Sequence, residues 1–299
     1  MPPPAQSSPD QVWTTKRLLD WLAGALADKN IDSPRLCAEM LLTHVLRCNR
    51  MHLYTQADRP ASPDEREALR DLAARALKHE PVQYLVGEAW FFALAFQADR
   101  RALIPRPATE TIVETILQHA RNNPATEPLR VADICTGSGC IAIALAKNLA
   151  GAHITATDIS PDALALAQEN AHRHAVADRI EFLQGDLLAP IPADAAPFHY
   201  IASNPPYIPD HEWDAVEPNV KEYEPTIALR AGADGLRFVN PLIDRAPDLL
   251  APGGTLLIEI ASCTEQQALS RAAASPLLRA PRILKDLEGL PRVLVAHRA

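Results

Sequence analysis

A short run in the second half of the chain has the residues needed to hold a planar amino group. Ser203 is followed by Asn204-Pro205-Pro206-Tyr207. The prolines lack a backbone N–H and have a fixed φ, so they keep the preceding residues extended and leave carbonyl groups that no strand pairs with. The Asn204 side-chain oxygen and the Pro205 carbonyl can accept both hydrogens of one –NH₂ group, and the Tyr207 ring can lie against its flat face. This geometry suits an amide or an aromatic amine.

The same tetrapeptide could also form an ordinary turn, since Asn and Pro are common in turns for local reasons. Residues 198–203 are apolar and β-prone, which predicts a buried strand that ends at Asn204. The choice between a turn and a site therefore depends on what precedes this strand.

Residues 131–149 have the layout of a nucleotide cradle. A short apolar strand, residues 131–135, runs into Thr136-Gly137-Ser138-Gly139, and a helical pattern begins at Cys140. Glycines let the backbone approach a ligand, and the free amides at a helix start face it. Ala142 stands where a dinucleotide site would have its third glycine, which argues against a dinucleotide.

Two acidic residues follow at the ends of later predicted strands. Asp158 can accept both hydroxyls of a ribose, and Asp186 can accept from an adenine amino group while Leu187 covers the ring. S-adenosylmethionine has a ribose, an adenine and no phosphate, and the ammonium of its amino-acid tail would pair with Asp133. We therefore expect S-adenosylmethionine as the cofactor.

The elements that position these residues begin with a helical part. Apolar side chains recur at three- and four-residue spacing after Thr14 and again after Ser33, the expected N-cap of a helix that begins at Pro34. A third such segment follows Ser62, which stands at capping-box spacing from Glu65. A small helical bundle over residues 14–80 is expected.

The segment between the bundle and the cradle is rich in aromatic residues. The pattern of residues 82–98, which include Gly87, predicts a β-hairpin. We expect its aromatic side chains to form a core between the domains rather than a surface that binds the substrate. Arg106, Thr109 and Glu110 then stand at a proline-braced helix entry, either as caps or as a wall of the active-site cleft.

The last part of the chain is expected to be scaffold. Residues 282–286 and 293–297 predict a closing antiparallel hairpin, and residues 265–274 a helix. Glu259 lies inside the apolar strand of residues 255–260, and because an unpaired buried carboxylate is costly, we expect it at the strand's mouth.

Length and composition set further bounds. A chain of 299 residues favours two domains, and a net charge of −8 argues against a protein that relies on many phosphate contacts. Five scattered cysteines without Cys-x-x-Cys pairs indicate neither a disulfide framework nor a zinc site. We expect a cytoplasmic monomer that binds no metal. Nucleic acid is an unlikely partner, and no association with a membrane is expected.

Taken together, these motifs resemble the class I S-adenosylmethionine-dependent methyltransferases that act on amino groups. Residues 81–87, 103–110, 223–225 and 232–236 narrow the resemblance to the peptide chain release factor glutamine methyltransferases. The resemblance implies an α/β fold with a Rossmann-like, seven-stranded, mostly parallel sheet. It also implies methyl transfer to the side-chain amide nitrogen of the glutamine in the Gly-Gly-Gln loop of release factors, which are the expected protein partners.

Three other interpretations are weighed against this one. The stretch from Cys135 to Gly139 resembles the paralogue that methylates a glutamine of a large-subunit ribosomal protein. Residues 106–110 and 285–293 instead follow the release-factor pattern, and we give more weight to this larger number of matches. An adenine amine in nucleic acid presents the same –NH₂ group after base flipping, and the acidic composition disfavours it. A non-catalytic binding protein should have a damaged motif, and Asn204-Pro205-Pro206-Tyr207 is intact.

The resemblance also divides the chain and assigns its site. The predicted domains are a disordered tail (1–13), a helical substrate-recognition domain (14–80), a β-hairpin linker (81–110) and the methyltransferase domain (111–299). The candidate catalytic residues are Asn204, Pro205, Pro206 and Tyr207, which with Arg106 also form the candidate substrate site. The candidate cofactor residues are Asp133, Cys135, Thr136, Gly137, Ser138, Gly139, Asp158, Ile159, Asp186, Leu187 and Asn204.

Overall fold

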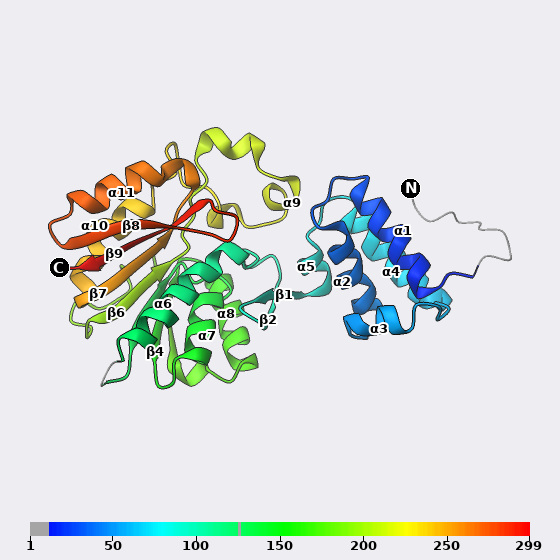
Figure 1. Cartoon of the computed structure of the whole chain (residues 1–299), viewed down its shortest axis with the longest axis horizontal. Coiled ribbons are helices and arrows are strands. Elements are labelled where there is room, and N and C mark those ends of the chain that lie inside the picture. Colours follow the sequence, from blue (N-terminus) through cyan, green and yellow to red (C-terminus); the bar gives the residue numbers. More distant parts are fainter. Residues whose placement is uncertain (1–11, 125–126) are drawn as a thin grey trace. The chain divides into compact units, whose positions relative to one another are not determined.

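The computed structural model describes residues 12–124 and 127–299, so the predicted tail over residues 1–11 lies outside the described residues. The described chain forms two compact units (Figure 1). The first contains the residues up to Gly87 together with residues 217–223, and the second contains residues 88–216 and 224–299. None of the helices in the described ranges has the length and hydrophobicity needed to span a bilayer.

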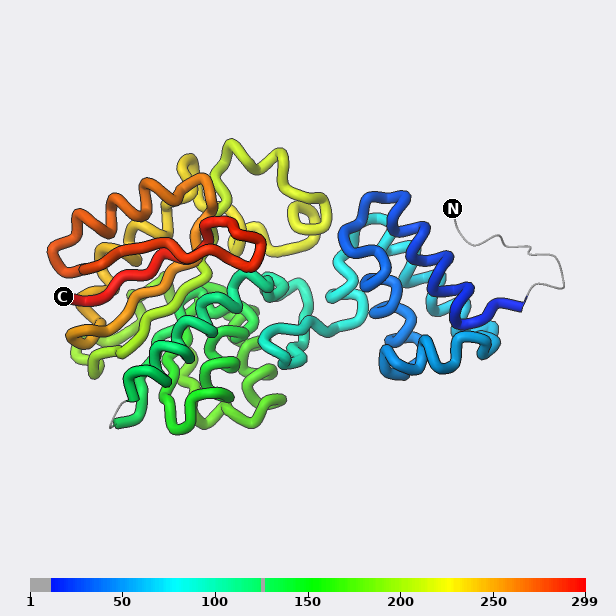
Figure 2. Tube along the Cα trace, in the orientation of Figure 1, coloured from blue at the N-terminus to red at the C-terminus, as the bar shows by residue number. Residues whose placement is uncertain are grey.

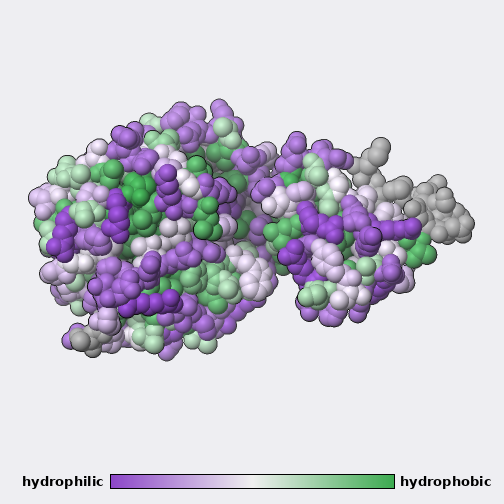
Figure 3. All heavy atoms as spheres, in the orientation of Figure 1, coloured by the Kyte–Doolittle hydropathy of each residue, from purple (hydrophilic) through white to green (hydrophobic). Residues whose placement is uncertain are grey.

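The first unit is a helical bundle. Leucines on one face of α1, α2 and α4 are fully buried and form its core, while the face seen in Figure 3 is largely hydrophilic. The predicted capping box is present, since the Ser62 hydroxyl accepts from the Glu65 amide (3.2 Å) and the Glu65 carboxylate accepts from the Ser62 amide (2.8 Å). The helices are α1 (Thr15–Ala27), α2 (Pro34–Leu46), α3 (Arg50–Thr55), α4 (Pro63–Ala76), α5 (Val82–Val86) and α9 (Pro218–Lys221).

Ser33 is the N-cap residue of α2, which begins at Pro34 as predicted, but the Ser33 side chain makes no capping hydrogen bond; the carboxylate of Asp32 accepts from the Ser33 amide instead (2.8 Å). Two other local expectations for this unit are wrong. Trp13, placed in the tail, packs edge-on against Trp21 with ring centroids 6.3 Å apart. Residues 82–86 form the short helix α5 and not hairpin, because Pro81 presets the first turn and Gly87, with φ of 72°, ends it.

The hairpin is therefore shorter than predicted and belongs to the second unit. It consists of β1 (Glu88–Phe91) and β2 (Leu94–Gln97), which pair antiparallel. Phe91 and Phe96 are fully buried in the apolar cluster on one side of the second unit, so these aromatics form core within that unit.

The second unit is built on a seven-stranded sheet with the order β5-β4-β3-β6-β7-β9-β8. The first five of these strands are parallel, while β9 runs antiparallel to both β7 and β8, as the closing hairpin predicts. This confirms the Rossmann-like fold class. The strands are β3 (Arg130–Ile134), β4 (His153–Asp158), β5 (Ile180–Gln184), β6 (Phe198–Ser203), β7 (Leu250–Glu259), β8 (Leu278–Lys285) and β9 (Pro291–Arg298).

Helices cover both faces of this sheet (Figure 1). The helices α6 (Glu110–Asn122), α7 (Cys140–Asn148) and α8 (Pro161–Arg173) bury their apolar sides on one face. On the other face lie α10 (Val239–Leu249) and α11 (Glu265–Ala274). Because both faces are covered, β3 and β6 are buried along nearly their whole length.

The strand order reverses beside β3, and this point fixes where a ligand can bind. Ile134 at the end of β3 lies opposite Thr157 of β4 and Ser203 of β6, whose hydroxyl donates to the Ile134 carbonyl (2.7 Å). Parallel open sheets bind ligands outside the carboxyl ends of the strands at such a reversal. The long excursion after β6, traced in Figure 2, begins at this edge.

Candidate active site

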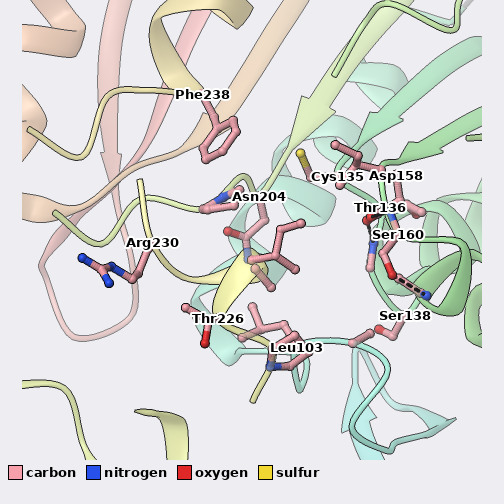
Figure 4. Close-up of a pocket in the computed structure, with 18 of the residues that line it drawn as sticks. Leu103, Cys135, Thr136, Ser138, Asp158, Ser160, Asn204, Thr226, Arg230 and Phe238 are labelled. Atoms are coloured by element: carbon pink, nitrogen blue, oxygen red, sulfur yellow. Dashed lines mark hydrogen bonds between the residues drawn. The ribbon is translucent and has the colours of Figure 1, made fainter. Parts of the chain in front are cut away.

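A cavity of about 580 Å³ opens in the second unit at this edge of the sheet, a size that suits a small-molecule ligand. In Figure 4, Asn204 lies between Phe238 and Leu103, across from Cys135 and Asp158. The predicted site residues that line the cavity are Arg106, Cys135, Thr136, Gly137, Ser138, Asp158, Ile159, Asp186, Leu187, Asn204 and Pro206. The lining does not include Asp133, Gly139, Pro205 or Tyr207.

Asp133 stabilises the glycine turn through hydrogen bonds. It is fully buried, and its Oδ2 accepts from the Thr136 hydroxyl (2.6 Å) and the Ala142 amide (3.1 Å). Its Oδ1 is buried without a partner among the described residues. Burial raises the pKa of Asp133 from its ordinary 3.8 to about 7. A buried acceptor of this kind requires a donor, and the ammonium group of S-adenosylmethionine fits that requirement.

We expect Asp133→Asn to weaken binding of S-adenosylmethionine roughly tenfold or more, the cost of one charge-assisted hydrogen bond. The asparagine oxygen can still accept from Thr136 and Ala142. The pKa of Asp133 is raised to about 7 in the folded state, so ionisation of this carboxyl lowers the free energy of unfolding of the wild type as the pH rises from about 4 to 7. The variant should therefore unfold at an unchanged or higher temperature at pH 8. Calorimetric titration and thermal unfolding at pH 6 and 8 measure both effects, and an unchanged affinity would restrict Asp133 to holding the turn.

Close packing explains the last glycine of the turn. Gly139 has φ of 81°, and a Cβ there would lie 3.0 Å from Ile143 Cδ1 and 3.1 Å from Ala167 Cβ. Asn170 of α8, which the sequence analysis did not single out, is fully buried and donates to the Ser138 carbonyl (3.0 Å). Its only sequence signal is a polar residue on an apolar helix face.

Asp158 stands at the end of β4 with both carboxylate oxygens held. Oδ2 accepts from the Gly137 amide (2.9 Å) and Oδ1 from the Ser160 amide (2.9 Å). Burial raises its pKa, and these backbone hydrogen bonds oppose that shift. Asp158 therefore lies beside the glycine turn with a fixed orientation, as a ribose-binding carboxylate requires.

Asn204 is half-buried where β6 ends. Its Nδ2 donates to the Thr109 hydroxyl (3.0 Å), and no donor in the described part of the chain reaches its Oδ1. No backbone amide in the described ranges donates to the carbonyl of Pro205. Both oxygens thus have no hydrogen-bond partner within the described chain, but of the two residues Asn204 alone lines the cavity.

Tyr207 points its hydroxyl away from the cavity lining. The hydroxyl donates to Glu259 Oε1 (3.1 Å), and burial raises its pKa. Gly235 fixes the backbone here, because it has φ of 76° and a Cβ would lie 2.8 Å from the Tyr207 carbonyl oxygen. Glu259 does end β7, but it is fully buried between hydroxyl partners and not exposed at a mouth.

Arg106 lines the cavity and forms an ion pair with Glu224. The other oxygen of Glu224 accepts from the Ile104 amide (3.0 Å), so this pair fixes the segment before α6. The sequence analysis missed several cavity residues that come from loops without periodic patterns: Leu103, Thr226, Arg230 and Phe238.

A Rossmann-like sheet with a glycine turn after β3, acids after β4 and β5, and Asn-Pro-Pro-Tyr after β6 defines a methyltransferase. The fold is shared with the solved METTL16 methyltransferase domain (17% identity, 76% of this chain and 79% of that one, TM-score 0.51). Family models of the PrmC N-terminal domain and the methyltransferase small domain match residues 17–87 and 107–222.

Curated relatives extend the comparison from the fold to the chemistry. The release factor glutamine methyltransferase of Geobacter sulfurreducens is 44% identical over 84% of this chain and 85% of that protein. The release factor glutamine methyltransferase of Chlorobaculum tepidum is 43% identical over 84% of this chain and 86% of that protein. The one of Rhodopirellula baltica is 36% identical over 99% of this chain and 100% of that protein. The chain belongs to the release factor glutamine methyltransferase family, which confirms the resemblance drawn from the motifs.

Proposed function

We propose that this protein transfers the methyl group of S-adenosylmethionine to the side-chain amide nitrogen of the glutamine in the Gly-Gly-Gln loop of a peptide chain release factor. The relatives' names support the acceptor. The observation that carries the proposal is the position of Asn204, whose unpaired Oδ1 stands in the same cavity as the glycine turn after β3.

The cavity residues fit the proposed cofactor. Asp158 would bind the ribose of S-adenosylmethionine, and Asp186 and Leu187 would bind its adenine. The turn at Gly137 would lie against the remaining part of the cofactor. When bound, S-adenosylmethionine supplies an electrophilic methyl group on its sulfonium. The protein's own contribution is to hold the acceptor nitrogen.

An amide nitrogen is a poor nucleophile because its lone pair is delocalised into the carbonyl. Asn204 Oδ1 and the Pro205 carbonyl would accept its two hydrogens, which fixes the direction of the lone pair and holds the nitrogen in line for attack. The same oxygens favour the positive charge that develops on nitrogen. No strong base is required, because the proton can leave to water after the methyl group has arrived.

The experiment is mass spectrometry of candidate acceptors. The protein is incubated with methyl-labelled S-adenosylmethionine and with a release factor, a large-subunit ribosomal protein or adenine-containing nucleic acid. We expect one methyl group on the glutamine of the Gly-Gly-Gln loop. Label on the ribosomal protein or on adenine in place of the release factor would contradict the proposed acceptor.

The helical unit is proposed to recognise the protein substrate and not the cofactor. A chain of residues 88–299 should bind S-adenosylmethionine with unchanged affinity, because all cavity residues lie in the second unit. Its kcat/KM on an intact release factor should fall roughly tenfold or more, the cost of losing one interface hot spot. Loss of cofactor binding by a shortened chain that circular dichroism shows to be folded would contradict this division of roles.

A further inference from the structure

A buried carboxylate beside the proposed acceptor site has no part in the mechanism above. Glu259 is fully buried at the end of β7, next to β6, where Ile258 lies opposite Ser203. Its Oε2 accepts from the Thr109 hydroxyl (2.6 Å) and its Oε1 from the Tyr207 hydroxyl (3.1 Å). Since Thr109 also contacts Asn204, a hydrogen-bonded chain runs from Asn204 through Thr109 to Glu259.

The direction of this chain follows from the number of protons in it. A threonine hydroxyl has one hydrogen, and Thr109 donates it to Oε2 of Glu259. Oγ1 of Thr109 then has only lone pairs to offer. It must receive the –NH₂ end of Asn204, which leaves Oδ1 as the end that is free for the acceptor.

We infer that Glu259 is a positioning residue, which acts through Thr109 to set which end of the Asn204 amide faces the acceptor and through Tyr207 to hold the same loop. The inference rests on the proposed function. An amide turned the other way would present –NH₂ to the –NH₂ of the acceptor, and two donors cannot pair. The carboxylate thus specifies the chemistry of a site that it does not touch.

The surroundings of Glu259 bear on its charge. Burial raises its pKa, while the hydroxyls of Thr109 and Tyr207 and the guanidinium groups of Arg106 and Arg292 oppose the shift. A raised pKa in the folded state means that the ionised form lowers stability at every pH above its ordinary 4.5. Neutralising Glu259 should therefore not destabilise the fold, which separates an orienting role from a structural one.

Glu259→Gln is the decisive variant because it keeps the shape, removes the charge and adds a donor that can reverse the chain. We expect kcat for methylation of the release factor to fall at least about tenfold, a smaller effect than the roughly 10²- to 10³-fold loss when a direct polar partner is removed. The affinity for S-adenosylmethionine and the melting temperature should not fall. A parallel loss of melting temperature and kcat would overturn the inference, as would a wild-type kcat.

A second pair of variants keeps the test decisive if Glu259→Gln does not fold. Thr109→Val has the same shape but breaks the chain and should lower kcat similarly, whereas Thr109→Ser should restore activity. Thr155→Val makes the matched change at another buried threonine, in β4, and should leave kcat unchanged. Equal activity of Thr109→Val and the wild type overturns the inference alone, whereas a wild type that does not methylate the release factor overturns the proposed function.

Discussion

Asn204→Ala should lower the rate of methyl transfer roughly 10²- to 10³-fold, as removal of one preorganised polar partner does in other enzymes. The variant removes one of the two acceptors that would orient the attacking nitrogen. The affinity for S-adenosylmethionine should change much less, because the amide mainly addresses the acceptor. Single-turnover methylation of a release factor, with calorimetric titration of the cofactor alongside, measures both quantities.

Asn204→Asp is the companion variant. It keeps an acceptor oxygen toward the cavity, but its second oxygen would face the lone pairs of Thr109, whose hydrogen is directed to Glu259. It should retain more activity than Asn204→Ala and less than the wild type, and its added charge should favour a more basic amine. Near wild-type transfer by Asn204→Ala would mean that the tetrapeptide is only a turn.

Asp158→Ala should weaken binding of S-adenosylmethionine roughly 10²-fold, equivalent to the loss of one or two hydrogen bonds to a charged group. The change removes the expected ribose acceptor and leaves the amides of Gly137 and Ser160 without their partner. Asp162→Ala is the matched control, since this exposed acid lies in the first turn of α8. The control should bind normally, and equal affinities of the two variants would refute the assignment of Asp158.

Local elements were predictable where a single pattern determines them. The strand over residues 198–203 and the helix over residues 265–274 have the predicted bounds, because apolar periodicity and the prolines or polar residues that flank them act within a few residues. The helix α5 was not predictable in this way. Four of its five residues are Val, Tyr or Leu, which favour a strand, and the flanking Pro81 and Gly87 make the segment helical.

The candidate site was predictable in part for a topological reason. Residues that follow parallel strands meet at one edge of a sheet, so Asp158 and Asn204 could be placed together from the positions of their strands alone. The bond between Thr109 and Glu259 joins residues 150 positions apart. No local sequence pattern around either residue indicates that the two are in contact. Because burying a carboxylate is costly, the sequence suggested that Glu259 is exposed, whereas the fold buries it and supplies two hydroxyl donors.

The left-handed backbone at Cys135 bears on how family signatures should be interpreted. Cys135 has φ of 60°, a conformation that glycine adopts without strain and that costs other residues on the order of 1 kcal/mol or more. It lies at the glycine turn, where the cofactor is expected, and it lines the same cavity as Asn204. A single base change interconverts cysteine and glycine codons. An exchange between them here changes the conformational freedom of the turn beside the expected cofactor, and therefore the strain stored at this position.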